Sequence, residues 1–140
     1  MTTRRPLILQ VEDNLADIEY ARESCFDAGC RADFQIATDG EKAIQWLRNV
    51  RDSAVEKPDL ILLDLNLPKV KGHEILVFIK SQPQLSQIPV VVLSGSESSV
   101  EKARSLLLGA SDHVLKPTGY RETLALIQAL GTYIPKPDES

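Results

Sequence analysis

The sequence predicts an α/β fold in which five parallel strands form a central sheet with helices on both faces. Two observations indicate this fold. Short, almost wholly apolar runs alternate along the chain with longer segments whose apolar residues recur at helical spacing, without an internal repeat. Strands that are apolar on both sides need helices on both faces, and this alternation is typical of such sheets. The length of 140 residues suits one domain with its own core.

Each strand and helix has a place in this pattern. We expect strands at residues 7–11, 33–37, 59–63, 90–93 and 113–115. We expect helices at residues 15–28, 40–49, 73–81, 99–108 and 120–130. Together they form a single domain over residues 1–140, with a core at about residues 6–132 and a flexible tail at residues 135–140.

Local signals mark the ends of the first helix. Asn14 is a suitable N-cap, and Gly29 gives the helix a stop. Cys25 and Cys30 have neither redox-motif nor zinc-site spacing, so we expect two reduced structural thiols.

The later elements follow the same logic. The strand at residues 59–63 is the most apolar and should be central. The residues expected to share a helix face are Ala43, Ile44 and Leu47, then Ile75, Leu76 and Ile79, then Val100, Ala103 and Leu107, and finally Leu124, Ile127 and Leu130. Right-handed crossovers leave few arrangements of such elements. We therefore expect a flavodoxin-like (βα)5 three-layer sandwich with sheet order 2-1-3-4-5.

Five polar residues stand at the ends of the apolar runs. Glu12 and Asp13 follow the first run, Asp64 the third, Ser94 the fourth and Lys116 the fifth. In an open parallel sheet, ligands bind outside the carboxyl ends of the strands, so these side chains should share one crevice.

This set of residues suits a metal ion beside a phosphoryl group. Three carboxylates in a small space repel one another, and a divalent cation relieves that repulsion. Oxygen ligands favour Mg²⁺, with Mn²⁺ as the alternative. Asp64 is the candidate nucleophile for an aspartyl phosphate. The metal, Lys116 and Ser94 would each neutralise or bind one phosphoryl oxygen.

Four segments together resemble the receiver domain of two-component response regulators. They are Leu9–Asn14, Leu62–Pro68, Val92–Gly95 and Leu115–Pro117, and the resemblance covers about residues 6–132. It implies a phosphoacceptor signalling protein that assists its own phosphorylation and dephosphorylation and is not a conventional enzyme. It also implies that Asp64 receives phosphate from a histidine kinase.

The resemblance further implies individual roles. The main-chain carbonyl of Asn66 would join Glu12, Asp13 and Asp64 around Mg²⁺. Ser94 would be the switch hydroxyl and Lys116 the phosphate-pairing lysine. His113 stands where many members carry a switch Tyr or Phe, and it would turn inward after Ser94 moves towards the phosphate; alternatively it is a half-buried strand histidine with no role in switching. His73 is expected to be an ordinary surface residue.

A narrower resemblance is to the small stand-alone regulators that partner bacterial phytochromes, particularly in cyanobacteria. The segment from Asp64 to Lys69, the long connection before the third strand and the lack of an output domain carry it. It implies a phytochrome as the kinase and an unknown downstream protein that binds the surface of the fourth helix, fifth strand and fifth helix. We expect a homodimer on this surface, extended by Tyr133 and Ile134; alternatively these two residues cover the domain's own edge.

Composition and motifs argue against several other classes of protein. The net charge of −4 argues against nucleic-acid binding, and no apolar run spans a membrane, so we expect a cytoplasmic protein. No phosphate-binding glycine motif follows the first strand. A phosphate-independent pseudo-receiver remains an alternative, although it would usually lack one of the five site residues. A haloacid-dehalogenase-type phosphohydrolase would need an acid two positions after Asp64, where Asn66 stands.

Overall fold

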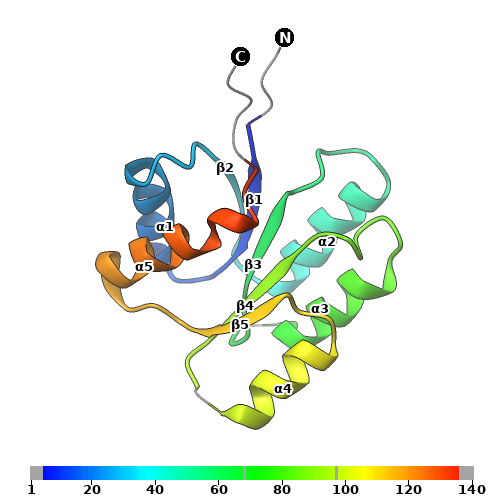
Figure 1. Cartoon of the computed structure of the whole chain (residues 1–140). Helices are drawn as coiled ribbons and strands as arrows, with labels where there is room; N and C mark the ends of the chain where they lie inside the picture. The colour runs from blue at the N-terminus through cyan, green and yellow to red at the C-terminus, as the bar shows by residue number, and fades with distance from the viewer. Residues whose placement is uncertain (1–4, 68, 97, 136–140) are drawn as a thin grey trace.

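The computed structural model of the chain describes residues 5–67, 69–96 and 98–135, and its five strands form one parallel sheet in the order β2-β1-β3-β4-β5 (Figure 1). The strands are β1 (Leu7–Val11), β2 (Asp33–Ala37), β3 (Leu60–Asp64), β4 (Val90–Ser94) and β5 (Asp112–Leu115). The helices are α1 (Leu15–Asp27), α2 (Gly40–Arg51), α3 (Gly72–Ser81), α4 (Ser99–Leu107), α5 (Gly119–Ala129) and the 3-10 turn η1 (Leu130–Thr132). The predicted fold class and strand order are confirmed, and the predicted element bounds are within two residues of those observed.

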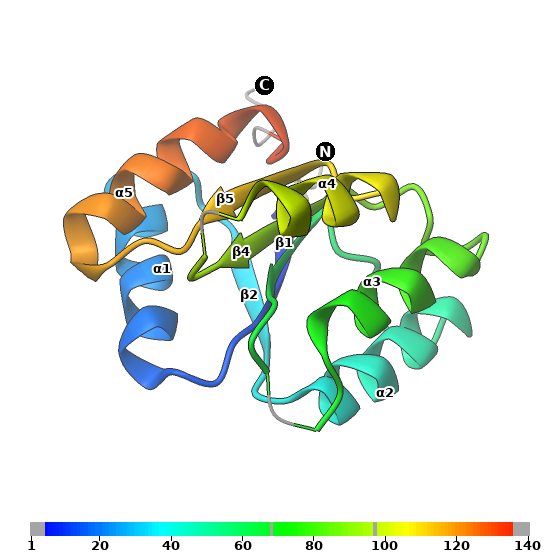
Figure 2. The ribbon, with the colours of Figure 1, turned by 90° about the horizontal axis from the view of Figure 1, so that it is seen from below.

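Helices cover both faces of the sheet, so the molecule has three layers. Helices α1 and α5 pack together on one face, whereas α2, α3 and α4 lie on the other (Figures 1 and 2). Successive residues of the central strand β3 point to opposite layers: Leu60 and Leu62 join the cluster beneath α5, and Ile61 and Leu63 join the larger cluster beneath α2 and α3. This explains why that strand has no polar position before Asp64.

Helix α4 differs from the prediction in the direction of its apolar face. Val100, Ala103 and Leu107 were expected to share a face, but all three are exposed, with 78% of Val100 and 88% of Leu107 accessible. The one buried residue of this helix is Ser105. Helix α4 therefore buries a polar side chain, and its apolar side chains are exposed to solvent.

The prediction of two free thiols is wrong, because Cys25 and Cys30 form a disulfide. The physical reason is the way α1 ends. Gly29 adopts a positive φ of 75°, and the Cys30 N–H then donates to the Cys25 carbonyl at 3.0 Å. This is the Schellman end of a helix, which brings these two positions into contact. Their Cα atoms are 5.2 Å apart, a separation that a disulfide can span.

The C-terminal residues after α5 close the layer formed by α1 and α5. Ile134 is buried and belongs to the core cluster that contains Leu130, and Tyr133 packs against the same cluster. These two residues therefore cover the domain's own edge, which was the alternative to a role in a dimer. Residues 136–140, most of the expected flexible tail, lie outside the described residues. Among the described residues, no helix has the length and apolar character needed to cross a membrane.

Candidate functional site

The acidic residues of the site meet where the order of the sheet reverses. Strands β1 and β3 are direct neighbours, so Glu12 and Asp13, just after β1, lie beside Asp64, the last residue of β3. One carboxylate oxygen from each lies within 4.8 Å of the others. Glu12 and Asp64 are buried and Asp13 is exposed. The structure thus brings together the three expected carboxylates and opens the group to solvent on one side.

Burial makes the negative charge of Glu12 energetically costly. The residue is 1% exposed, and this burial raises the pKa of Glu12 from its usual 4.5 to about 7. The charge of Asp64 acts in the same direction, whereas hydrogen bonds from the Lys116 ammonium and the Asn14 N–H oppose the rise. A bound cation would relieve this penalty, and the oxygen-only donor set fits a small divalent ion.

Lys116 lies at the centre of the carboxylates. Its Nζ is 3.0 Å from Glu12 Oε2, 3.0 Å from Asp64 Oδ2 and 3.3 Å from Asp17 Oδ2. Burial alone lowers the pKa of Lys116, but the hydrogen bonds to Glu12 and Asp64 outweigh it and raise the pKa well above its ordinary value. Its backbone N–H also donates to the Ser94 carbonyl, at 2.7 Å, which fixes the loop after β5 beside β4.

Asp17 is a site residue that the sequence reasoning missed. It lies in the first turn of α1, where its backbone N–H donates to the Asn14 side chain that caps the helix. This turn follows directly from the loop after β1, so its side chains face the same crevice. An acidic residue in the first turn after the first strand was the signal that was available.

Asp64 has both carboxylate oxygens engaged. Oδ1 accepts a hydrogen bond from the Asn66 N–H at 2.9 Å, and Oδ2 pairs with Lys116. Asn66 itself is exposed in the β3–α3 loop. The proposed role of its main-chain carbonyl as a metal ligand stays a prediction.

Ser94 ends β4 with its side chain fully buried. Its hydroxyl donates to Oε1 of Glu101 in α4 at 2.7 Å and accepts from the Ser96 N–H at 3.1 Å. Glu101 is thus a second residue that the sequence reasoning missed. Its position seven residues after Ser94, one turn into a helix, gave no separate signal.

A chain of three side chains links α3, α4 and β5. Ser105 Oγ lies 2.9 Å from His73 Nε2 and 2.9 Å from His113 Nδ1. His73 is half-buried, so the expectation of an ordinary surface residue is wrong; it faces the one buried residue of α4. His113 is already inside, 5% exposed, so the expected inward turn is not a movement that this structure offers.

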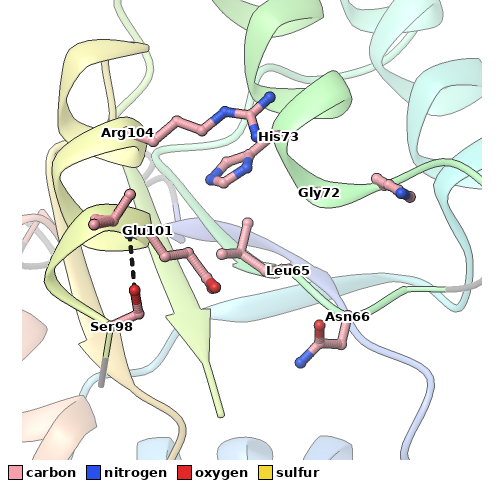
Figure 3. A pocket seen from close by; sticks show the side chains of 9 residues that line it. Leu65, Asn66, Gly72, His73, Ser98, Glu101 and Arg104 are labelled. Carbon is pink, nitrogen blue, oxygen red and sulfur yellow. Dashed lines mark hydrogen bonds between the residues drawn. The ribbon is translucent and has the colours of Figure 1, made fainter. Parts of the chain in front are cut away.

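A hollow of about 360 Å³ lies beside the site, between the β3–α3 loop, the start of α3 and α4. Figure 3 shows Glu101 reaching from α4 towards Leu65, with Arg104 and His73 on the other side of the opening. The hollow therefore borders the hydrogen bond between α4 and Ser94 on one side and the Asp64 loop on the other.

Comparisons with known proteins agree with this geometry. The family model described as "Response regulator receiver domain" matches residues 8–128. Response regulator Rcp1 of Synechocystis sp. (strain ATCC 27184 / PCC 6803 / Kazusa) is 33% identical over 128 residues, which is 91% of this chain and 87% of that protein. The probable methanogenesis regulatory protein FilR2 of Methanothrix harundinacea (strain 6Ac) is 32% identical over 127 residues, 91% of this chain and 82% of that protein.

Solved structures give the same result. The phosphorylated cyanobacterial phytochrome response regulator RcpA superimposes with a TM-score of 0.84 at 32% identity and covers 97% of this chain and 100% of its own. The Mn²⁺-bound form of Rcp1 superimposes with a TM-score of 0.80 at 33% identity and covers 91% and 92%.

Proposed function

Because this chain belongs to the response regulator receiver domain family, we propose that Asp64 accepts a phosphoryl group from a histidine kinase in a reaction assisted by a divalent cation. The observation that carries this proposal is the position of the Lys116 ammonium, 3.0 Å from the Asp64 carboxylate within the cluster of acidic residues. In a pseudo-receiver we would expect one of the five strand-end residues to be missing.

In the proposed transfer, a carboxylate oxygen of Asp64 attacks phosphorus while the bond to the kinase's histidine nitrogen breaks. The nitrogen keeps the electron pair and takes up a proton. The Lys116 ammonium already forms an ion pair with Asp64, so it can pair with a phosphoryl oxygen by a small movement away from Glu12 or Asp17. Such reactions depend on positioning and charge neutralisation, and these side chains supply both.

Glu12, Asp13 and Asp64, with the main-chain carbonyl of Asn66, would hold Mg²⁺ or Mn²⁺. When bound, the ion neutralises charge on the carboxylates and the phosphoryl oxygens. The choice of a divalent ion is supported by the oxygen donor set here and by the manganese in the structure of Rcp1.

The kinase in this proposal is a phytochrome, and the reaction is in the cytoplasm. The support is the similarity to RcpA, a cyanobacterial phytochrome response regulator. A panel of histidine kinases, phytochromes among them, would each be phosphorylated and mixed with the chain. Transfer from a phytochrome faster than from the others would support the partnership, and preference for a kinase without a chromophore domain would contradict it.

The acceptor assignment is tested by incubating the chain with acetyl phosphate and Mg²⁺ and measuring intact mass. We expect the mass to rise by one phosphoryl group, and we expect the adduct to be lost in base and to be absent when EDTA replaces Mg²⁺. Asp64→Asn should take up no phosphate. Asp52→Asn, an exposed carboxylate at the far end of α2, is the matched control and should be labelled like the wild type. Labelling of Asp64→Asn at the wild-type level would refute the assignment.

A further inference from the structure

Glu101 accepts a hydrogen bond from the Ser94 hydroxyl, which would otherwise be free to bind a phosphoryl group on Asp64. Ser94 is fully buried, and its Oγ lies 2.7 Å from Glu101 Oε1. A serine hydroxyl carries one proton and can donate it to only one acceptor at a time. Here the proton is directed at a carboxylate, and such charge-assisted bonds are shorter and stronger than those between neutral groups.

We infer that Glu101 is a positioning residue that holds the Ser94 hydroxyl in its own hydrogen bond and competes with the phosphoryl group for the hydroxyl proton. This inference rests on the proposed function, because it requires a phosphoryl group on Asp64. For Ser94 to donate to a phosphoryl oxygen, the bond to Glu101 must break. The strength of that bond therefore opposes the phosphorylated conformation, and weakening it shifts the population towards that conformation.

The start of α4 contains a second hydrogen-bond partner for the released carboxylate. Ser98 and Glu101 have the spacing of a capping box, in which the serine side chain and the acidic side chain each accept the other residue's backbone N–H. Half of this motif is formed: Ser98 Oγ accepts from the Glu101 N–H at 3.3 Å (Figure 3). The Ser98 N–H instead donates to Ser96 Oγ, at 3.1 Å, because the Glu101 side chain is occupied by Ser94.

The surroundings of Glu101 allow this exchange. Its side chain borders the hollow of about 360 Å³, and Arg104 lines the same hollow one turn further along α4. A carboxylate that leaves Ser94 can therefore complete the capping box or approach Arg104 without displacing a packed side chain. Either movement changes the first turn of α4, which also carries the exposed Val100. The hydrogen bond thus couples the phosphorylation site to the apolar surface of α4.

The test uses beryllium fluoride with Mg²⁺ as the probe, because this complex imitates a phosphoryl group on an aspartate. We expect Glu101→Gln to bind it about five- to tenfold more tightly than the wild type, since a neutral amide is a weaker acceptor for the Ser94 proton. Titration calorimetry measures the affinity. Glu122→Gln, which removes an exposed carboxylate from the first turn of α5, is the control for loss of one acidic charge and should leave the affinity unchanged.

Loss of a negative charge near an anionic ligand would also tighten binding, so Ser94→Ala separates the two causes. If Glu101 acts through Ser94, Glu101→Gln should give no gain in affinity when Ser94→Ala is also present. An equal gain in both backgrounds, or no gain in either, would overturn the inference. Failure of the wild type both to bind the probe and to accept phosphate on Asp64 would instead overturn the proposed function, and this inference with it.

Discussion

Ser105 lies between two histidine rings and can donate its single hydroxyl proton to only one of them. The Nε2 atom of His113 is buried without a hydrogen-bond partner among the described residues, and folded proteins leave a buried N–H unpaired less often than a buried acceptor. The favourable arrangement is therefore His113 Nδ1–H donating to Ser105, with the Ser105 hydroxyl donating to His73 Nε2. This arrangement requires His73 to be neutral.

Protonation of His73 should therefore destabilise the fold. Burial, together with the charge of Arg104, lowers the pKa of His73 below its ordinary 6.5. As pH falls below about 6.5, the unfolded chain takes up this proton before the folded chain does, so the stability that neutral His73 contributes above that pH is lost. Glu12 acts in the opposite direction: its pKa is raised to about 7, so the folded chain binds that proton first as pH falls.

The effect of His73 is isolated by comparing the wild type with His73→Asn. Glu12 is present in both proteins, so its contribution to the pH dependence of stability cancels in the difference. Urea denaturation of both proteins at several pH values between 7.5 and 5.5, all buffered solutions containing EDTA, gives the difference in unfolding free energy. We expect this difference to shrink as pH falls below about 6.5, because His73 takes up its proton in the unfolded chain before it does so in the folded chain. A constant difference would show that His73 does not lose its hydrogen bond through protonation.

At the scale of the elements, the disulfide between Cys25 and Cys30 cross-links the C-terminal end of α1. The disulfide joins residues separated by five positions, so it closes a short loop. Chain-entropy arguments assign a loop of this size a stabilisation of about 2 kcal/mol. In a reducing cytoplasm this stabilisation would be lost, because protein thiols are kept reduced there.

We expect dithiothreitol to lower the urea midpoint of the wild type and to leave that of Cys30→Ser unchanged. Phosphate uptake by Asp64 should be the same in both redox states, because the cross-link lies at the end of α1 opposite to the site. A midpoint that does not respond to reduction would contradict a stabilising role for the disulfide, and altered phosphate uptake would contradict its independence from the site.

Helix α4 is the least firmly held of the helices around the site. Its only buried residue is Ser105. Among the described residues, two polar contacts join it to the rest of the fold: Ser105 contacts the two histidines, and Glu101 accepts a hydrogen bond from Ser94. An element with few buried apolar side chains opens or shifts at low cost. Under the proposed function, such an element would take two positions that a phosphoryl group distinguishes.

At the scale of the whole molecule, the sheet was predictable because the apolar runs have the lengths and spacing of buried strands. The strand-end residues were predictable for the same reason: once the sheet order is known, Glu12, Asp64 and Lys116 must meet. The rotation of α4 could not be predicted. Helical spacing identified a face with Val100 and Leu107, but the polar Ser105 faces inward because two histidines from distant elements satisfy its hydroxyl.

The outward apolar face of α4 suggests how the molecule assembles. Four large apolar side chains of α4 and β5 are exposed: Val100, Leu106, Leu107 and Leu115. A cluster of exposed apolar residues is typical of a surface that another protein covers. We propose that this surface forms the homodimer and that phosphorylation changes it through Glu101.

Leu107→Glu should therefore prevent dimerisation, because a carboxylate in a dimer interface loses its hydration without gaining a partner. Sedimentation velocity with and without beryllium fluoride and Mg²⁺ measures the fraction of dimer. Phe26→Glu is the matched control: Phe26 is 84% exposed, close to the 88% of Leu107, but lies on α1 in the opposite layer. The control should assemble like the wild type. A wild type that stays monomeric in both states would end the dimer proposal, and loss of the dimer in Phe26→Glu but not in Leu107→Glu would move the interface to α1.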